Sequence, residues 1–140
     1  MEDVFGIEEI GCSLGCETFS PKLGERLRIG LEIARTHKGD EEGFIRRLYD
    51  VVGTGVGIIE SVPAALSVAY FAQDPNRSCL LCANMAGDTD TIGAMATAVC
   101  GAFTGAGQIK QEYIDTLRQQ NDADFDHYIR ILEIGRERLA

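Results

Sequence analysis

The sequence has few basic residues and no long apolar run. Its 13 Lys and Arg residues are outnumbered by 22 Asp and Glu residues, which gives a formal net charge of −9. This balance argues against non-specific binding to nucleic acid or to an anionic membrane surface, because such binding needs Lys and Arg to neutralise phosphates. No apolar stretch approaches the roughly 18 residues that a membrane-spanning helix requires. We therefore expect no nucleic-acid partner and no membrane partner.

The sequence also shows no signal-peptide pattern, and its five cysteines are odd in number. Both features favour free thiols in a reducing cytoplasm. Cys12-x₃-Cys16 and Cys79-x₂-Cys82 would in principle supply four thiolates to a zinc ion. The second pair, however, lies in an apolar run at helical spacing, where free Cys behaves as a small hydrophobe. We favour a cytoplasmic protein without a zinc site.

Neither the alternating pattern of a β-strand nor a hairpin signal occurs in the chain. Apolar residues instead recur at helical spacing almost throughout, which predicts an all-α fold. A chain of 140 residues with 45% hydrophobic content is expected to form a single domain, residues 1–140, with a substantial core. Residues 1–19 show no readable pattern and are expected to be irregular. The predicted helices cover about residues 20–37, 40–52, 61–71, 74–87, 92–103, 109–119 and 122–138.

The predicted helix over 92–103 is made almost entirely of small residues. Its larger side chains form one stripe, which consists of Ile92, Met95, Val99 and Phe103. A helix with so little side-chain bulk can approach its neighbours closely. We therefore expect this helix to be central and buried.

Two carboxylates and a hydroxyl stand just before that helix, at Asp88, Asp90 and Thr91, between Gly87 and Gly93. In a turn leading into a helix, both carboxylates can converge on one ligand, and they are the hard oxygen donors that Mg²⁺, Mn²⁺ or Ca²⁺ prefers. The alternative is that the acids only cap the following helix. Taken alone, the pattern leaves both interpretations open.

Three other motifs are weaker. An EF-hand loop beginning at Asp88 would need acidic or amide ligands at positions occupied by Ile92 and Val99, so it is rejected. Haloacid-dehalogenase phosphatases place Asp-x-Asp after a buried strand, whereas a helix end is predicted here. The run from Gly53 to Gly57 lacks the lysine of a P-loop and the spacing of a dinucleotide fingerprint, but it suits a turn that a ligand can approach.

Several of these segments together resemble the C-terminal part of the ADP-ribosylglycohydrolase family. They are Gly53-x-Gly55, Glu60-Ser61-Val62-Pro63-Ala64-Ala65, and Gly87-Asp88-Thr89-Asp90-Thr91-Ile92-Gly93-Ala94 with the small-residue helix after it. The resemblance covers roughly residues 20–120. It implies an all-α orthogonal helical bundle, of which this chain would be the C-terminal part. It also implies hydrolysis of the glycosidic bond between ADP-ribose and an acceptor, with two Mg²⁺ or Mn²⁺ ions in the site.

Carried over by position, the resemblance implies roles for individual residues. Asp88, Asp90 and Thr91 would be one set of metal ligands. Thr54, Gly55 and Val56 would lie beside the bound nucleotide. The stretch from Glu60 to Pro63 would open the helix that backs the site.

The chain departs from the family in one large respect. Family members are usually much longer, and their N-terminal half supplies a second acidic metal cluster of the Thr/Ser-Asp-Asp kind. No Asp-Asp pair occurs in this sequence. We therefore expect at most one ion to be well held, and little turnover by this chain alone. Two functions stay open: a hydrolase whose missing half is another chain, a second copy or lost by truncation, and a non-catalytic module for ADP-ribose binding, structure or assembly.

Two histidines and two neighbouring aromatic residues are interpreted as lying outside any functional site. His37 and His127 lie among polar neighbours on predicted helices and are expected at the surface. Tyr70 and Phe71 are expected to be core aromatics rather than a platform for adenine.

Overall fold

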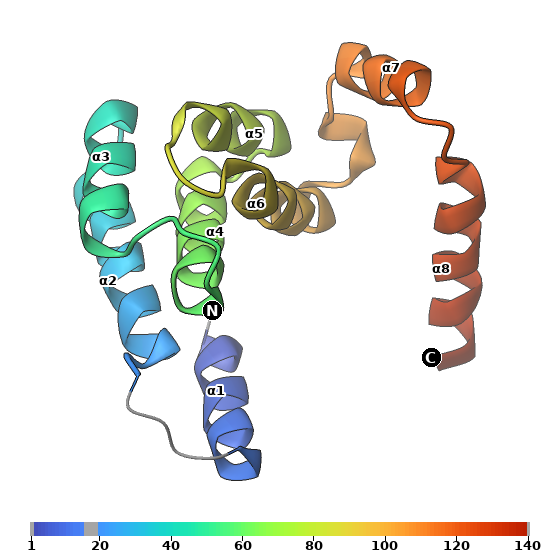
Figure 1. The fold of residues 1–140 in the computed structure, drawn as a ribbon. Helices are drawn as coiled ribbons and strands as arrows, with labels where there is room; N and C mark the ends of the chain where they lie inside the picture. The colour runs from blue at the N-terminus through green and yellow to red at the C-terminus, as the bar shows by residue number, and fades with distance from the viewer. Residues whose placement is uncertain (1, 16–19, 140) are drawn as a thin grey trace. The chain divides into compact units, whose positions relative to one another are not determined.

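The computed structural model describes residues 2–15 and 20–139, with side chains from residue 5 onward, and the regular elements of these segments are all helices (Figure 1). The α-helices are α1 (Glu2–Leu14), α2 (Leu23–Thr36), α3 (Glu41–Val51), α4 (Ile58–Ala72), α5 (Pro75–Asn84), α6 (Thr89–Thr104), α7 (Gln111–Gln120) and α8 (Phe125–Leu139). A short 3₁₀ helix, η1, covers Ala106–Gln108. The prediction of an all-α fold is confirmed. None of the described helices is both long and apolar enough to cross a membrane.

The helices form two compact units, Met1–Gln108 and Ile109–Ala140. The first unit contains α1 to α6 and the second contains α7 and α8. In the second unit the two helices are joined by an ion pair between Arg118 and Asp126 at 2.9 Å, and neither helix contains a buried residue. The organisation into a single domain stays a prediction.

Helix α4 is the centre of the first unit. It packs against α2, α5 and α6, and Figure 1 shows it between α2 and the α5–α6 pair. Its length is lined with small buried residues, which let the neighbouring helices come close. The buried core contains, from α4 and its partners, Ala64, Ala65, Val68, Ala69, Ala72, Phe44, Leu48, Leu81, Cys82, Ile92, Ala96 and Cys100.

The expectation that α6 is central and buried is wrong for much of its surface, although the helix does pack against both α4 and α5. Only one face of α6 is buried, at Ile92, Ala96 and Cys100, which recur every four residues. Val99 and Phe103, placed by sequence on the buried stripe, are 43% and 85% exposed. Small residues allow neighbouring helices to approach any side of a helix. Their number in the sequence therefore did not indicate which side of α6 packs against its neighbours. In the structure the close approach occurs at Gly93, where an added Cβ would lie 3.3 Å from Cys82 Cβ.

The N-terminal segment is also a correction, because residues 2–14 form helix α1 rather than irregular chain. The helix is held by tertiary contacts. The Glu8 carboxylate accepts a hydrogen bond of 2.9 Å from the Gly24 amide, and the Arg28 guanidinium lies 4.1 Å from the centre of the Phe5 ring. A side chain at residue 24 would collide with Glu8. The sequence pattern missed the helix because its apolar Ile7 and Ile10 stay exposed and no amphipathic face is buried.

Two of the expected helix starts are confirmed by their caps. Asp40 accepts a hydrogen bond from the Gly43 amide at 2.9 Å, and Asp74 accepts one from the Arg77 amide at 2.7 Å, with Pro75 as the first helical residue. Two other starts were misplaced. α2 begins at Leu23 rather than after Ser20, and α4 begins at Ile58, three residues before Ser61.

Candidate functional site

The two acidic residues of the predicted metal set lie at the N-terminus of α6. Asp88 is the residue before the helix, and its side chain makes no capping hydrogen bond, whereas Asp90 lies in the first turn. The neighbouring Asp88 side chain, followed by the backbone amides of Thr91 and Asp90, lowers the pKa of Asp90. Two carboxyl groups therefore lie together at the surface, beside the exposed Thr91. The capping interpretation therefore fails for the Asp88 side chain.

The turn before α6 is shaped by Gly87. This residue has φ +99°, a conformation that glycine adopts without steric cost. A Cβ at this position would collide with the carbonyl oxygen and the hydroxyl of Thr54. Gly87 thus lets the turn lie directly against the loop that contains Thr54.

Thr54 joins the two predicted motifs, although they are more than thirty residues apart in the chain. Its hydroxyl donates a hydrogen bond of 2.6 Å to the Ala86 carbonyl, and its own carbonyl accepts one of 2.7 Å from the Asp88 amide. The residue is buried, with 3% of its surface exposed. A buried polar group without a hydrogen-bond partner is unfavourable, and here both the hydroxyl and the carbonyl have one. The predicted nucleotide loop and the predicted metal turn are therefore held side by side.

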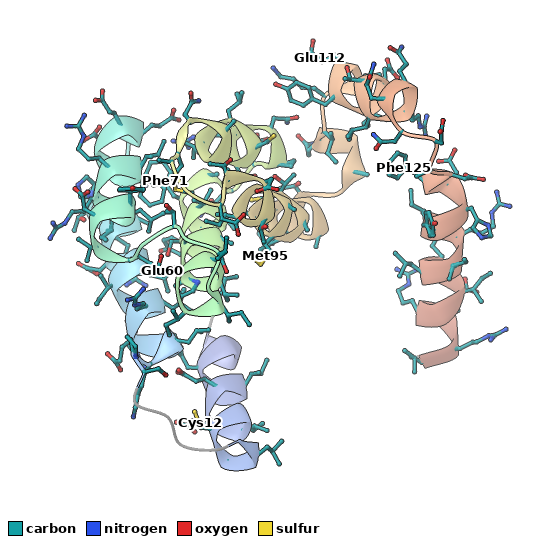
Figure 2. The ribbon with its side chains drawn as sticks, in the orientation of Figure 1. Cys12, Glu60, Phe71, Met95, Glu112 and Phe125 are labelled. Carbon is teal, nitrogen blue, oxygen red and sulfur yellow. The ribbon has the colours of Figure 1, made fainter. Side chains whose placement is uncertain are left out.

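The loop is held from its other side by Glu60, in the first turn of α4. One oxygen of the Glu60 carboxylate accepts a hydrogen bond of 2.8 Å from the Gly55 amide, and the other lies 3.5 Å from Arg26 Nη1. That nitrogen also donates a 2.7 Å hydrogen bond to the Val52 carbonyl. Gly53, with φ +86°, leaves the room that the Glu60 carboxylate occupies. Figure 2 shows Glu60 at the end of α4 that faces this loop.

Sequence reasoning missed Arg26 and the role of Glu60. Glu60 was predicted only to open a helix, and nothing in the local pattern around Arg26 distinguishes it from the other arginines of α2. Its partner Glu60 is thirty-four residues away, so only the folded chain shows the pair. Within the predicted loop trio, Thr54 and the Gly55 amide have protein partners, whereas the Val56 side chain is 84% exposed. Val56 is thus the member of the trio that presents its side chain to solvent.

The ligand atoms at this site are of the kind that a hard divalent cation prefers, but there are too few of them to fill its coordination shell. Asp88, Asp90 and Thr91 provide oxygen atoms only, which suits Mg²⁺ or Mn²⁺. Among the residues that the structure describes, however, no group of three or more His, Cys, Asp or Glu side chains is placed to hold a metal ion. The set is therefore a partial shell, with the remaining positions left to water, substrate or other ligands.

Two alternative sites are not formed in the described part of the chain. Cys12 is exposed on α1 and Cys82 is buried in the core, so these thiols do not gather into a zinc site there; Cys16 lies outside the described residues. The Asp88-x-Asp90 pair follows helix α5, whereas a dehalogenase-type phosphatase needs a strand at that place. The phosphatase alternative is excluded.

Comparison with known proteins gives relatives that are all much longer than this chain. A protein of Escherichia coli strain K12 named Uncharacterized protein YegU is 48% identical over 121 residues, which is 86% of this chain and 36% of that protein. Human ADP-ribosylhydrolase ARH3 is 27% identical over 84 residues, covering 52% of this chain and 23% of that protein. The mouse protein of the same name is 30% identical over 73 residues, covering 44% and 20%. No solved structure matches the chain significantly.

The model of the ADP-ribosylglycohydrolase family matches residues 8–138. This match includes the Thr54 loop, the Glu60 anchor and the Asp88 turn, which are the parts that the structure brings together. The resemblance noted from these segments is confirmed. The chain belongs to the ADP-ribosylglycohydrolase family.

Proposed function

We propose that the loop at residues 53–57 and the turn at residues 86–91 form part of a site for hydrolysis of ADP-ribosyl glycosidic linkages. The observation that carries this proposal is the double hydrogen bonding of Thr54, which holds the exposed loop against two surface carboxylates. The family match supports the same function, as do two relatives that are named ADP-ribosylhydrolases.

In this proposal Asp88, Asp90 and Thr91 hold one Mg²⁺ or Mn²⁺ ion. A bound cation in such a site supplies positive charge that orients an oxygen-rich substrate and stabilises charge that develops as the bond breaks. The chain's own residues do the positioning. Gly87 and Thr54 hold the backbone at Asp88 in place, and Glu60 with Arg26 holds the loop so that Val56 faces the ligand.

Asp88 and Asp90 are assigned to the ion, and the third carboxylate of the site, Glu60, is held by Arg26 and the Gly55 amide. Glycosidic bond hydrolysis usually needs a positioned acid or base as well as a charged stabilising group. We therefore propose that full activity requires further acidic groups from outside residues 1–140. The same observation favours the second candidate function, in which the chain binds ADP-ribose and does not cleave it.

Calorimetric titration of ADP-ribose, first with Mg²⁺ and then with EDTA, tests the proposal. We expect Mg²⁺-dependent binding that Asp88→Asn weakens by at least about tenfold, the effect of losing one charge-assisted ligand. Asp115→Asn is the matched control, because Asp115 is an exposed acid on α7, in the compact unit that contains neither the loop nor the turn. Binding that is equal in EDTA, or equally weakened by both variants, would contradict the proposal.

The two candidate functions are then separated by turnover. Hydrolysis of an ADP-ribosylated peptide by the chain alone, measured as release of ADP-ribose, would favour a catalytic site. Mg²⁺-dependent binding without release would favour the binding module. Restoration of release by adding a second protein with the missing acidic cluster would identify the complementing partner.

A further inference from the structure

A cavity of about 390 Å³ lies at the C-terminal end of α4. It is lined by the end of α2 and the turn after it, the last residues of α4, and Arg77 near the start of α5. Its volume falls in the range of about 300–1,000 Å³ that is usual for small-molecule sites. Glu60 and the acidic turn lie at the other end of α4, roughly 20 Å away at 1.5 Å per residue. Figure 2 shows Phe71, which lines the cavity, and Glu60 at opposite ends of this helix. The cavity is thus separate from the proposed hydrolase site.

The charge of the cavity is opposite to that of the chain as a whole. Arg35, Lys38 and Arg77 line it, and no Asp or Glu is among its lining residues. The whole chain carries 22 acidic residues against 13 Lys and Arg. A lining with three cationic residues and no acidic one therefore differs from the average composition of the chain. A positively lined cavity attracts anionic ligands and discourages cationic ones.

Aromatic rings hold both arginines in place. The Arg77 guanidinium carbon lies 4.8 Å from the centre of the Phe71 ring, and the Arg35 guanidinium carbon lies 5.6 Å from the centre of the Tyr70 ring. Phe71 is itself fixed, because it stacks on the buried Phe44 with ring centres 4.0 Å apart. A guanidinium that is already held loses less freedom when a ligand binds. The expectation that Tyr70 and Phe71 are core aromatics is therefore only partly right, since their rings also support two cations at a cavity.

Carboxylates outside the lining neutralise part of this charge. Arg77 donates through Nε to Glu41 at 2.7 Å, and Arg35 Nη1 lies 3.6 Å from Glu32. Both pairs are largely exposed, so they are weak and compete poorly with a dianion. Lys38 has no carboxylate within ion-pair distance in the described part of the chain and contributes an uncompensated positive charge. Three cationic side chains, two from the end of α2 and the turn after it and one from α5, thus line one space.

We propose that this cavity binds a small phosphorylated molecule, with the phosphate held among Arg35, Lys38 and Arg77. Guanidinium groups match the geometry of phosphate oxygens, and an ammonium adds a compact charge. The volume corresponds to about a dozen waters at roughly 30 Å³ each, which exceeds the need of a bare phosphate. The remaining space accommodates the organic part of the ligand beside Tyr70 and Gln73.

Nuclear magnetic resonance titration of the ¹⁵N-labelled chain tests this site. The probes are inorganic phosphate and adenosine monophosphate, with adenosine as the uncharged control, all in EDTA and at constant ionic strength. EDTA removes any contribution from a metal at Asp88 and Asp90. We expect saturable shifts of the Gly39 and Gln73 amides with both phosphates, and no shift of the Gly55 and Gly87 amides. Adenosine should move neither group.

Variants test whether phosphate binds at the cavity or is attracted non-specifically by surface cations elsewhere. Lys38→Ala should weaken phosphate binding about fivefold to tenfold, and Lys38→Arg should restore most of it. Arg46→Ala is the matched control, because Arg46 is an exposed cation on α3 outside the cavity. The amide spectrum of each variant shows whether it is folded. Absence of saturation, or equal weakening by Lys38→Ala and Arg46→Ala, would overturn the proposal, whatever happens at the acidic turn.

Discussion

The two ends of α4 carry opposite chemistry. At its N-terminal end Glu60, Asp88 and Asp90 make an acidic surface around a loop that is tightly hydrogen-bonded. At its C-terminal end Arg35, Lys38 and Arg77 line a cavity that contains no acid in its lining. The acidic end needs a cation before it can bind an anionic ligand, whereas the basic end does not. One helix therefore separates a proposed site that we expect to depend on metal from a proposed site that we expect to be independent of it.

The largest expected loss of stability comes from replacing Gly87. Gly87→Ala forces a Cβ into the backbone and hydroxyl of Thr54, at a residue with positive φ. We expect the free energy of unfolding to fall by about 2–4 kcal/mol, from overpacking together with backbone strain. Urea denaturation measures this loss.

Gly39→Ala is the control for that experiment. Gly39 also has positive φ, at +91°, but an added Cβ would have no atom within 4 Å. It should lower the unfolding free energy by only about 1 kcal/mol. Equal losses in the two variants would mean that strain alone acts at residue 87, and that contact with Thr54 is unimportant for the acidic end.

The second effect concerns Cys82, which lies in the core between α5 and α6 beside α4. Burial, and then the neighbouring Cys79 and Cys100, raise the pKa of the Cys82 thiol from its ordinary value of 9.0 to about 11. The folded state keeps this proton after the unfolded state has lost it. Its stability is therefore fully present below pH 9 and declines between pH 9 and 11, by roughly 2–3 kcal/mol.

Urea denaturation from pH 8 to 11, compared with Cys82→Ala, checks this decline. The variant should start less stable but lose stability less steeply with pH. At pH 8, mass mapping after thiol alkylation should find the exposed Cys79 modified much faster than Cys82. Parallel pH profiles, or equal modification of the two thiols, would show that Cys82 is not shielded.

A smaller effect is expected at the Glu60 anchor. Glu60→Gln removes the charge that Arg26 contacts and weakens the hydrogen bond from the Gly55 amide. We expect a loss of about 1–2 kcal/mol and faster hydrogen exchange at Gly55. Glu32→Gln, which alters an exposed pair on α2, should cost at most about 0.5 kcal/mol. An unchanged exchange rate at Gly55 would mean that Glu60 does not order the acidic end.

The smallest expected effect is the salt dependence of ligand binding, which should differ between the two ends of α4. Raising NaCl from 50 to 200 mM should weaken phosphate binding at the cavity by about threefold, because its cations are exposed to solvent and are screened by salt. At the acidic end, EDTA should have a larger effect on ADP-ribose binding than salt. Loss of phosphate binding in EDTA would remove the contrast between the two ends.

Local sequence was informative wherever local interactions decide structure. Asp40 and Asp74 were readable as caps because a cap bonds an amide only three residues away. A turn at Gly87 and Asp88 before a helix was readable because the glycine and the carboxylates are adjacent. The predicted helix start at Ile92 was three residues late, because α6 begins at Thr89 and already contains Asp90 and Thr91 in its first turn. The start of α4 was misjudged because Pro63 marks helix starts in general, whereas this helix begins five residues earlier and tolerates proline in its second turn.

By itself, the sequence determined the all-α class, the family and the position of the carboxylate pair, because these depend on spacing and on contiguous motifs. The tertiary structure alone decided that Thr54 joins the loop to the turn, that Arg26 pairs with Glu60, and that three cations meet at the far end of α4. Each of these contacts links residues from different helices or loops. Such contacts arise from packing against a shared core, and no local periodicity records them.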